Sequence, residues 1–255
     1  MIKAENLTLQ RADKTIINNI DLTLQSGELL GVLGTNGAGK STLLAGLCGE
    51  LGSVTGRVIL DDRPLDAWPA TERACHLAVL PQTARLNFAF LVSEVVGFGR
   101  LPHNTGFTKD QAIIQEVLDL TNISYLAKRN YLELSGGERQ RVHLARVLAQ
   151  LWPINNQSVL LLDEPTSMLD PLHQHTLLKV VKYCAQQGAA VMVIVHDLNL
   201  AACYCDQLIF LQAGKIFTQG IPQQVLTVEN IKTIFGLDVL IQPHPIQGYP
   251  LVIAC

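Results

Sequence analysis

The chain alternates short apolar runs with longer stretches in which apolar residues return every three or four positions. Runs that are apolar at consecutive positions are typical of strands buried on both faces of a sheet, and the longer spacing is typical of amphipathic helices. Strands that alternate with helices indicate an α/β fold with a largely parallel sheet. The runs interpreted as buried strands are residues 29–33, 58–60, 77–80, 159–162 and 190–195.

The first part of the chain has a different pattern. Residues 4–9 and 20–24 have the composition of strands, and a polar turn at residues 11–14 lies between them. Neighbouring strands joined by a turn pair in antiparallel fashion, so we expect an antiparallel β region at the edge of the main sheet.

Strand patterns disappear between about residue 83 and residue 151 of the sequence. Helical spacing takes their place, and Pro102, Gly106 and Asn122 separate the segments. We interpret this block as a helical subdomain inserted into the α/β core. The predicted helices are residues 92–98, 110–121 and 136–150.

These patterns predict one domain over residues 1–255. Its core comprises residues 1–82 and 152–255, and the helical subdomain, residues 83–151, is inserted between them. The last part of the core should hold two short strands, one helix and a proline-rich tail. The strands are expected at residues 208–211 and 215–218, and the helix at residues 228–235.

Composition and charge narrow the range of functions. Hydrophobic residues make up 48% of the 255 residues, which is enough for a packed core, and the formal net charge is −3. Such a chain lacks the positive field that holds nucleic acid, so we expect no nucleic-acid partner. The six cysteines have no repeated spacing, the apolar runs are shorter than the ~20 residues of a membrane-spanning helix, and the N-terminal residues do not resemble a secretory signal. These features predict a cytoplasmic protein.

Residues 34–41 fit the phosphate-loop pattern G-x-x-x-x-G-K-[ST], after a strand pattern and before a helical one. The glycines allow successive backbone N–H groups to face an anion, and the following helix adds its positive end. An incidental glycine turn with a lysine is the alternative, which the flanking strand and helix disfavour. The residues assigned to nucleotide binding are Gly34, Thr35, Asn36, Gly37, Ala38, Gly39, Lys40, Ser41 and Thr42.

Three side chains of this loop have distinct expected roles. Lys40 should reach the β- and γ-phosphates as a point charge, and the Ser41 hydroxyl is placed to coordinate the Mg²⁺ that bridges them. Thr42 should contact the α-phosphate. The loop therefore predicts a bound polyphosphate with Mg²⁺.

A second predicted strand ends in two carboxylates. Residues 159–162 run directly into Asp163 and Glu164, at the edge of the sheet where open α/β folds bind ligands. Asp163 is suited to hold Mg²⁺ through water, and Glu164 is suited to act as the general base that polarises the attacking water. Two solvated acids at a strand end are the alternative, which the presence of a phosphate loop disfavours.

A pair of glycines opens the last helix of the helical block. Ser135 is its expected N-cap, with Glu138 three residues later as in a capping box. A well-capped helix is the plain interpretation. However, Gly136 and Gly137 in the first turn reduce helix stability and leave N–H groups open at a positive helix end. The sequence therefore predicts a second anion site.

The phosphate loop, the segment LSGGE at residues 134–138 and the strand ending in Asp163 and Glu164, in this order, resemble the nucleotide-binding domains of ATP-binding cassette (ABC) proteins. The resemblance implies a P-loop NTPase core of the RecA type, an antiparallel β edge region and an inserted helical subdomain, with ATP as the nucleotide. The LSGGE segment is called the signature of that family, and in a dimer the signature of one subunit closes over the nucleotide of the other. The residues expected to contact ATP across a homodimer are Ser135, Gly136, Gly137 and Glu138.

Further positions match the pattern of the family. Gln82, after a strand, matches the glutamine that contacts Mg²⁺ and senses the membrane partner, and Asp170 matches the acid that aligns the two subunits. His196, at a strand end, matches the histidine that contacts the γ-phosphate. The implied catalytic set is Glu164, His196, Lys40 and Gln82, with Ser41, Gln82 and Asp163 at the Mg²⁺.

One position departs from the family. Near residue 11 the family carries an aromatic residue that stacks on adenine, and this chain has Arg11 there. A guanidinium plane can stack on a base in place of an aromatic ring. We therefore expect only modest discrimination between ATP and GTP.

We expect no transport domain fused to this cassette, which resembles the ATPase subunits of bacterial importers. That resemblance implies two copies of an integral membrane permease, docked beside Gln82 between the helical block and the sheet, and a periplasmic binding protein that acts indirectly. It places the subunit at the cytoplasmic face of the inner membrane. Residues 86–103 resemble the group that serves iron-siderophore, haem and vitamin B12 uptake, and segments 240–245 and 250–253 resemble haem importers most.

Three alternatives stay open. Ferric siderophore or cobalamin as cargo would leave every ATPase residue unchanged. A cassette that acts in DNA repair or translation usually carries a long coiled-coil insertion or a tandem cassette, and this sequence contains neither. A module that binds ATP without turnover is disfavoured by Glu164 and His196.

Overall fold

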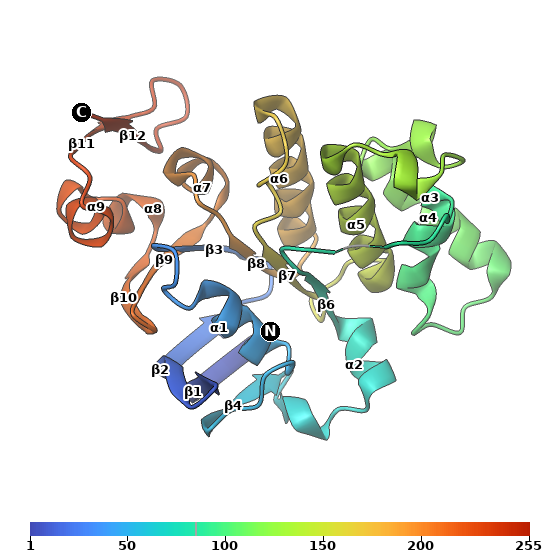
Figure 1. Ribbon diagram of the computed structural model, residues 1–255, viewed down its shortest axis with the longest axis horizontal. Coiled ribbons are helices and arrows are strands. Elements are labelled where there is room, and N and C mark those ends of the chain that lie inside the picture. The colour runs from blue at the N-terminus through green and yellow to red at the C-terminus, as the bar shows by residue number, and fades with distance from the viewer. Residues whose placement is uncertain (85) are drawn as a thin grey trace.

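The computed structural model of the chain describes residues 1–84 and 86–255. Its centre is a six-stranded sheet in the order β10-β9-β3-β8-β7-β6 (Figure 1). Neighbouring strands from β9 to β6 run parallel, and β10 pairs with β9 in antiparallel fashion. The predicted α/β class is confirmed. The strands are β3 (Leu29–Leu33), β6 (Leu77–Leu80), β7 (Val159–Asp163), β8 (Ala190–Ile194), β9 (Gln207–Gln212) and β10 (Lys215–Gly220).

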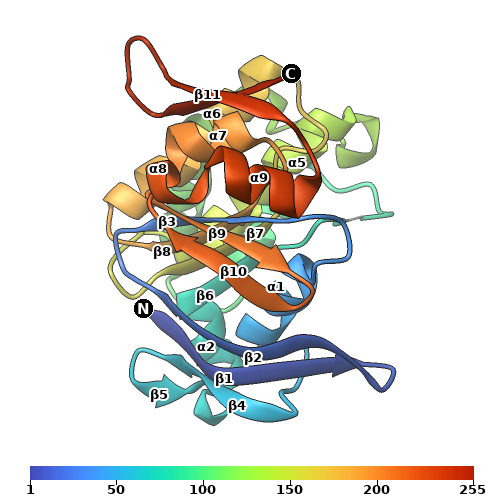
Figure 2. The ribbon, with the colours of Figure 1, turned by 90° about the vertical axis from the view of Figure 1, so that its left-hand side faces the viewer.

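A four-stranded antiparallel sheet, in the order β2-β1-β4-β5, lies below the central sheet (Figures 1 and 2). Its first two strands are the predicted antiparallel pair. Residues 58–60, expected in the parallel sheet, belong to β4 instead. Val58 and Leu60 are buried there and Ile59 is half-buried, and so short a run does not distinguish burial on one face from burial on two. The strands are β1 (Ile2–Arg11), β2 (Lys14–Leu24), β4 (Thr55–Leu60) and β5 (Arg63–Pro64).

The central sheet separates two hydrophobic cores. In β3, Leu29 and Leu33 belong to the core formed with the helices above the sheet, whereas Leu30 and Val32 belong to the core formed with the antiparallel sheet and one helix. Successive side chains of a strand point to opposite faces, and here both faces are covered. This explains the apolar runs in the sequence. The helices are α6 (Pro171–Gln186) and α7 (Leu198–Tyr204) above the sheet and α1 (Lys40–Leu47) below it (Figure 1).

The helical block lies at one end of the sheet, on the right of Figure 1. The predicted helices are present there with slightly different ends, and buried residues of all three join the upper core. The helices are α3 (Val92–Gly97), α4 (Phe107–Leu120) and α5 (Gly136–Leu151), and α2 (Ala70–His76) precedes β6. Among the helices of the described chain, none combines the length and the apolarity that a membrane crossing requires.

The proline-rich C-terminal part forms a β-hairpin, an element that the sequence analysis did not predict. Pro243 and Pro250 stand opposite each other next to the loop of this hairpin, where a missing backbone N–H is tolerated. The hairpin is fixed to α7 because the Asn199 side chain accepts a hydrogen bond from Val252 N (2.8 Å) and donates one to Val252 O (3.1 Å). The elements are α8 (Pro222–Val225), α9 (Val228–Phe235), β11 (Val239–Pro243) and β12 (Pro250–Ala254) (Figure 2).

Candidate functional site: a phosphate-loop cavity and a separate signature cavity

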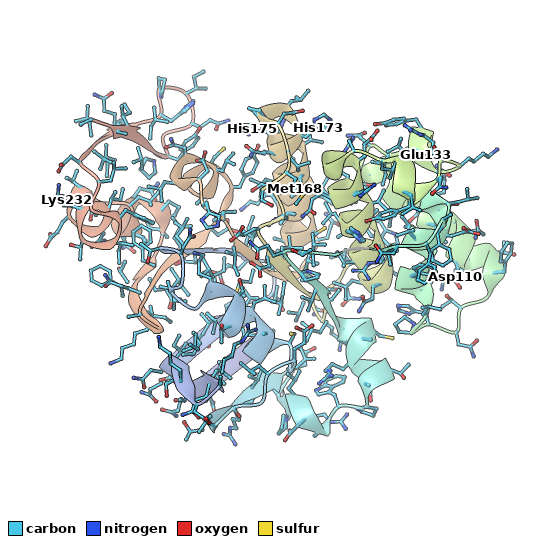
Figure 3. The ribbon with its side chains drawn as sticks, in the orientation of Figure 1. Asp110, Glu133, Met168, His173, His175 and Lys232 are labelled. Atoms are coloured by element: carbon cyan, nitrogen blue, oxygen red, sulfur yellow. The ribbon has the colours of Figure 1, made fainter. Side chains whose placement is uncertain are left out.

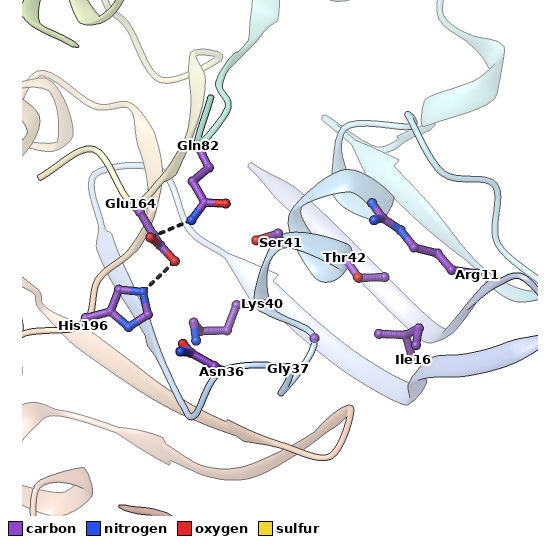
Figure 4. A pocket seen from close by; sticks show the side chains of 11 residues that line it. Arg11, Ile16, Asn36, Gly37, Lys40, Ser41, Thr42, Gln82, Glu164 and His196 are labelled. Carbon is purple, nitrogen blue, oxygen red and sulfur yellow. Dashed lines mark hydrogen bonds and ion pairs between the residues drawn. The ribbon is translucent and has the colours of Figure 1, made fainter. Parts of the chain in front are cut away.

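A cavity of about 700 Å³ opens at the carboxyl ends of the central strands (Figure 4). This is the edge at which open α/β sheets bind ligands. The structure brings together residues from the phosphate loop, the strand ends and the first hairpin, which are widely separated in the sequence. The lining residues are Arg11, Ile16, Asn36, Gly37, Gly39, Lys40, Ser41, Thr42, Gln82, Glu164 and His196.

The phosphate loop connects β3 to α1 and is shaped by glycine. Gly34 has a φ of 153°, and a Cβ atom there would lie 2.2 Å from the carbonyl oxygen of Leu211, so no larger residue fits. Gly39 precedes α1 and offers no side-chain cap, and the first turn of α1 carries no acidic residue. The first N–H groups of α1 therefore remain available to an anion in the cavity.

Lys40 lies across the mouth of this loop. Its Nζ donates hydrogen bonds to the carbonyl oxygens of Gly34 (2.8 Å) and Thr35 (3.0 Å), and only 6% of the residue is exposed. Burial lowers the pKa of Lys40, and the charges of Glu164 and Asp163 oppose that shift. The ammonium group is thus held beside the helix N-terminus, where it adds to the attraction for phosphate.

Asp163 ends β7 and is buried beside Ser41. Burial raises the pKa of Asp163, and a hydrogen bond with Ser41 opposes this shift. Its Oδ1 atom has no hydrogen-bond partner within residues 1–84 and 86–255. A buried carboxylate oxygen without a donor, next to a hydroxyl, fits a hard cation such as Mg²⁺. The described residues contain no cluster of three or more His, Cys, Asp or Glu side chains for a metal, so such a cation would rely on phosphate oxygens as further ligands.

Glu164 follows Asp163 and has a φ of 48°, a left-handed backbone conformation that is uncommon outside glycine. Both oxygens of its carboxylate are engaged, because His196 Nε2 donates to Oε1 (2.5 Å) and Gln82 Nε2 donates to Oε2 (2.8 Å) (Figure 4). Burial raises the pKa of Glu164, but these two hydrogen bonds outweigh it and the pKa lies below the usual value. Glu164 is therefore ionised at neutral pH and able to accept a proton.

The open side of the cavity is formed by the β1–β2 hairpin. Arg11 is exposed there, and Ile16 is half-buried on the facing strand. Ile16 was not assigned to the site from the sequence. The signal was available, because Ile17 is fully buried in the core and its neighbour must therefore point to the opposite face. Ile16 adds an apolar wall near Arg11, and the two suit a planar, partly apolar group.

The signature residues lie elsewhere. Ser135 caps α5 as predicted, since its hydroxyl accepts from Glu138 N (3.3 Å) and Glu138 Oε2 accepts from Ser135 N (2.8 Å). They line a second cavity of about 410 Å³, together with Met168, which lies beside α6 (Figure 3). The lining residues are Ser135, Gly136, Gly137, Glu138, Arg141, Met168, Leu169, Asp170 and His173. Among the residues that the structure describes, none lines both cavities, so the described part of one chain does not bring the signature to its own phosphate loop.

Asp170 has a structural partner in its own chain. It caps α6, because its Oδ1 accepts from His173 N (3.0 Å) and its Oδ2 pairs with His173 Nδ1 (2.7 Å). The hydrogen bonds of His173 lower the pKa of Asp170, that from its backbone N–H first. The acid is thus fixed at the edge of the signature cavity.

The sequence matches the ABC transporter family over residues 17–167. The "Hemin import ATP-binding protein HmuV" of Pseudomonas aeruginosa is 58% identical over 254 residues, which cover 100% of both chains. A protein of the same name from Gloeobacter violaceus is 49% identical, over 99% of this chain and 94% of its own.

Solved structures agree with these sequence matches. A metal-chelate type ABC transporter in an inward-facing conformation matches 100% of this chain and 96% of its own, with a TM-score of 0.81 and 28% identity. The dimeric cassette MJ0796, from a bacterial ABC transporter, has a TM-score of 0.77 at 23% identity, over 87% of this chain and 99% of its own, and therefore supports the fold alone.

Proposed function

This chain belongs to the ATP-binding subunits of ABC transporters, and we propose that it hydrolyses ATP to power the import of hemin. The assignment of hemin as the cargo rests on the 58% identity over the whole chain with a protein named for hemin import. The ATPase part rests on the cavity, which is lined by the phosphate loop and by the ionised Glu164, and on the buried carboxylate of Asp163 beside Ser41.

In the proposed reaction, the polyphosphate of ATP lies on the N–H groups of α1, with Lys40 at the β- and γ-phosphates and Thr42 at the α-phosphate. Ser41, Asp163 and Gln82 would hold Mg²⁺, which when bound neutralises charge on the phosphate oxygens. Glu164 takes a proton from a water molecule as that water attacks the γ-phosphorus, and ADP leaves. His196 holds Glu164 in place and contacts the γ-phosphate.

The complete centre needs a second copy of the chain. Ser135, Gly136, Gly137 and Glu138 would close over the nucleotide of the partner copy, and Asp170 would align the two subunits. This proposal is supported by the separation of the two cavities within one chain.

The transporter would also contain two copies of an integral membrane permease, served by a periplasmic binding protein. This subunit would sit at the cytoplasmic face of the inner membrane. The permease would dock between the core, residues 1–82 and 152–255, and the helical subdomain, residues 83–151. The match to a metal-chelate type transporter supports an arrangement with a membrane partner.

The test is reconstitution of the chain with its membrane partner in proteoliposomes, with ATP hydrolysis measured while cargo is offered on the opposite side. Hemin should stimulate hydrolysis and accumulate inside the accepting compartment, and the same complex with Glu164→Gln should do neither. Stimulation by a ferric siderophore or by cobalamin, without a response to hemin, would contradict the proposed cargo and leave the ATPase assignment intact. The metal-chelate transporter makes the siderophore the second candidate.

A further inference from the structure

A thiol and an imidazole meet at the boundary between the core and the helical subdomain. Cys75 lies in α2, on the core side, and His103 lies between α3 and α4, on the side of the helical subdomain. The Sγ atom of Cys75 is 3.9 Å from Nδ1 of His103, and both residues are half-buried. Neither residue lines the phosphate-loop cavity or the signature cavity, so the proposed ATPase reaction does not use this pair.

The backbone fixes the tautomer of His103. Its Nε2 atom lies 2.7 Å from the carbonyl oxygen of Gln150, and a carbonyl oxygen only accepts, so Nε2 carries a hydrogen and donates it. In the neutral ring, Nδ1 therefore holds the free lone pair, on the side that faces Cys75. Imidazoles that bind metal ions typically donate their other N–H to a carbonyl or a carboxylate in this way. His103 is thus oriented as a metal ligand would be.

The sulfur of Cys75 is surrounded by more acceptors than it can satisfy. It lies 3.5 Å from the carbonyl oxygen of Thr71 in its own helix, and 3.7 Å from that of Pro102 in the helical subdomain. Together with Nδ1 of His103, these make three acceptors around one S–H group. A cation between the sulfur and the ring would contact several electron-rich atoms at once.

The chemistry and the spacing of the pair indicate the class of ion. Thiolate ligands select soft or borderline ions such as Zn²⁺, and imidazole suits the same ion, whereas Mg²⁺ and Ca²⁺ prefer oxygen. At a tetrahedral zinc ion, with bonds of about 2.3 Å to sulfur and about 2.1 Å to nitrogen, these two atoms lie about 3.6 Å apart. The observed separation is 3.9 Å, so a small side-chain movement brings both atoms onto one ion.

We propose that Cys75 and His103 bind a thiophilic metal ion of the Zn²⁺ class, which ties α2 of the core to the helical subdomain. The inference goes beyond the proposed function and does not depend on it. When the metal–sulfur bond forms, the S–H bond breaks and its proton goes to solvent, and no electron is transferred.

The charges around Cys75 set the conditions for binding. Burial raises the pKa of the Cys75 thiol, the charge of Arg100 opposes this shift and the charge of Glu72 adds to it. The thiol is therefore protonated at neutral pH, and a metal ion must displace that proton. Arg100 is paired with Asp110 (2.9 Å), which weakens its repulsion of a cation.

The ion would strengthen a junction that hydrogen bonds already hold. The Gln150 side chain, on α5, donates to the carbonyl oxygens of Ala74 (2.8 Å) and Leu77 (3.1 Å), on either side of Cys75. Within residues 1–84 and 86–255, no third His, Cys, Asp or Glu side chain completes a metal site, so the Pro102 carbonyl and water fill the remaining positions. The affinity should therefore lie below that of structural zinc sites with four side-chain ligands.

The experiment uses the full chain, reduced and freed of metal, with Co²⁺ as a spectroscopic probe and Zn²⁺ measured by competition with a chelating indicator. The wild type should show the charge-transfer absorption of a cobalt-bound thiolate. Cys75→Ser keeps the size and the donor of the side chain but lacks the thiolate, so it should lose this absorption and bind Zn²⁺ at least about tenfold more weakly. Cys255→Ser is the matched control, because Cys255 is an exposed thiol at the C-terminus, and it should keep both properties.

A second variant separates metal binding from the packing of the junction. His103→Gln can still donate an N–H to the Gln150 carbonyl but has no ring nitrogen that faces Cys75, so it should weaken Zn²⁺ binding at least about tenfold. Its melting temperature without metal should stay close to that of the wild type. Zn²⁺ should raise the melting temperature of the wild type and of Cys255→Ser, and that of His103→Gln and Cys75→Ser much less.

The opposite outcomes are equally clear. A wild type without the thiolate absorption, or equal affinity and absorption in wild type and Cys75→Ser, would overturn the inference. Loss of the absorption in Cys255→Ser alone would place the thiolate ligand at the C-terminus and also overturn it. Each of these results would leave the proposed function standing, because none of them concerns the hydrolysis of ATP.

Discussion

The helices α1 and α5 both begin at a cavity, and their first turns differ. The helix α1 begins after Gly39 without a side-chain cap and without an acid in its first turn. The helix α5 begins after Ser135 with a complete capping box, in which Glu138 adds a carboxylate to the first turn. Hydrogen bonds from Ser135, that of its backbone N–H first, lower the pKa of Glu138, so this carboxylate is charged at neutral pH.

The difference indicates an order of binding. The N–H groups of α1 need an acceptor from outside the chain, and Lys40 adds a positive charge beside them. At α5, Ser135 and Glu138 already supply acceptors to N–H groups at the helix start. The negative charge of Glu138 also repels an incoming anion. The nucleotide should therefore bind first at α1, and α5 of a second copy should contribute only when the phosphate is already held.

The largest expected effect comes from Glu164→Gln, which leaves both helix ends intact. The variant keeps the size of the side chain and one of its two acceptor oxygens but removes the proton acceptor, so ATP turnover should fall about 10²–10⁴-fold. Because ATP stays at α1, α5 of the second copy should stay engaged and a stable dimer should accumulate. Steady-state hydrolysis and size-exclusion chromatography with ATP measure the two effects.

Turnover near that of the wild type would remove Glu164 from the role of base. Loss of turnover without an ATP-dependent dimer would keep the base and break the proposed link between the two helix ends.

A pair of glycine substitutions tests the two helix ends directly. Gly34→Ala places a Cβ against the carbonyl of Leu211, so it should weaken ATP binding by about a hundredfold or more. Gly137→Ala meets Leu169 Cδ2 at 3.1 Å, at the signature cavity, and should leave ATP binding by the isolated chain unchanged while turnover falls about tenfold. Equilibrium binding of a fluorescent ATP analogue and hydrolysis at saturating ATP distinguish the two.

Gly52→Ala is the control, because a Cβ there meets no atom within 4 Å. If Gly137→Ala weakened ATP binding by the isolated chain as strongly as Gly34→Ala, the order of binding inferred here would be wrong.

The parts of the candidate site whose local structure could be predicted from the sequence each lie in one short segment. The phosphate loop, the two acids at the end of β7 and the capping box of α5 each lie within a few consecutive residues, so their geometry follows from local sequence. The contacts around Glu164 are of another kind. Gln82 is 82 residues away in the chain and His196 is 32 residues away, and only the packed sheet brings them to the two oxygens of one carboxylate.

The misassignment of residues 58–60 and the unpredicted C-terminal hairpin also come from contacts between segments that are distant in the sequence. A run of three apolar residues in β4 does not indicate whether it joins the antiparallel sheet or the parallel one. The sheet is decided by the partner strand, β1, which is distant in the sequence. The C-terminal hairpin depends on Asn199 of α7, more than 50 residues before Val252.

A smaller effect is expected from the cap of α5. Ser135→Ala removes the hydroxyl that caps the helix, so the free energy of unfolding should fall by about 1 kcal/mol at neutral pH. The pKa of Glu138 in the folded chain lies below its usual value, so the stability that Glu138 contributes is present above that usual value and is lost as the pH falls through the folded pKa. Denaturant unfolding at several pH values should show the difference between wild type and variant shrinking below about pH 4.5.

A difference that grows on acidification would contradict the capping contact as the cause. Asp170→Asn is a useful comparison, because the Asp170 side chain also caps a helix, α6, but does so without a capping box.

The smallest effect is expected at Arg11, which is expected to contact the base of the nucleotide rather than its phosphates. If its guanidinium stacks on the base, Arg11→Ala should weaken ATP and GTP alike by about 2–5-fold, because a cation over a ring contributes about 0.5–1 kcal/mol at an exposed site and reads no base-specific edge. Arg11→Tyr should recover the affinity, since an aromatic ring supplies the same stacking surface. Competition binding of both nucleotides to the isolated chain measures this. A wild-type preference for ATP over GTP far above a few-fold, lost in Arg11→Ala, would mean that Arg11 or Ile16 recognises adenine specifically. Part of the nucleotide affinity that we assign to the N-terminus of α1 would then come from the β1–β2 hairpin.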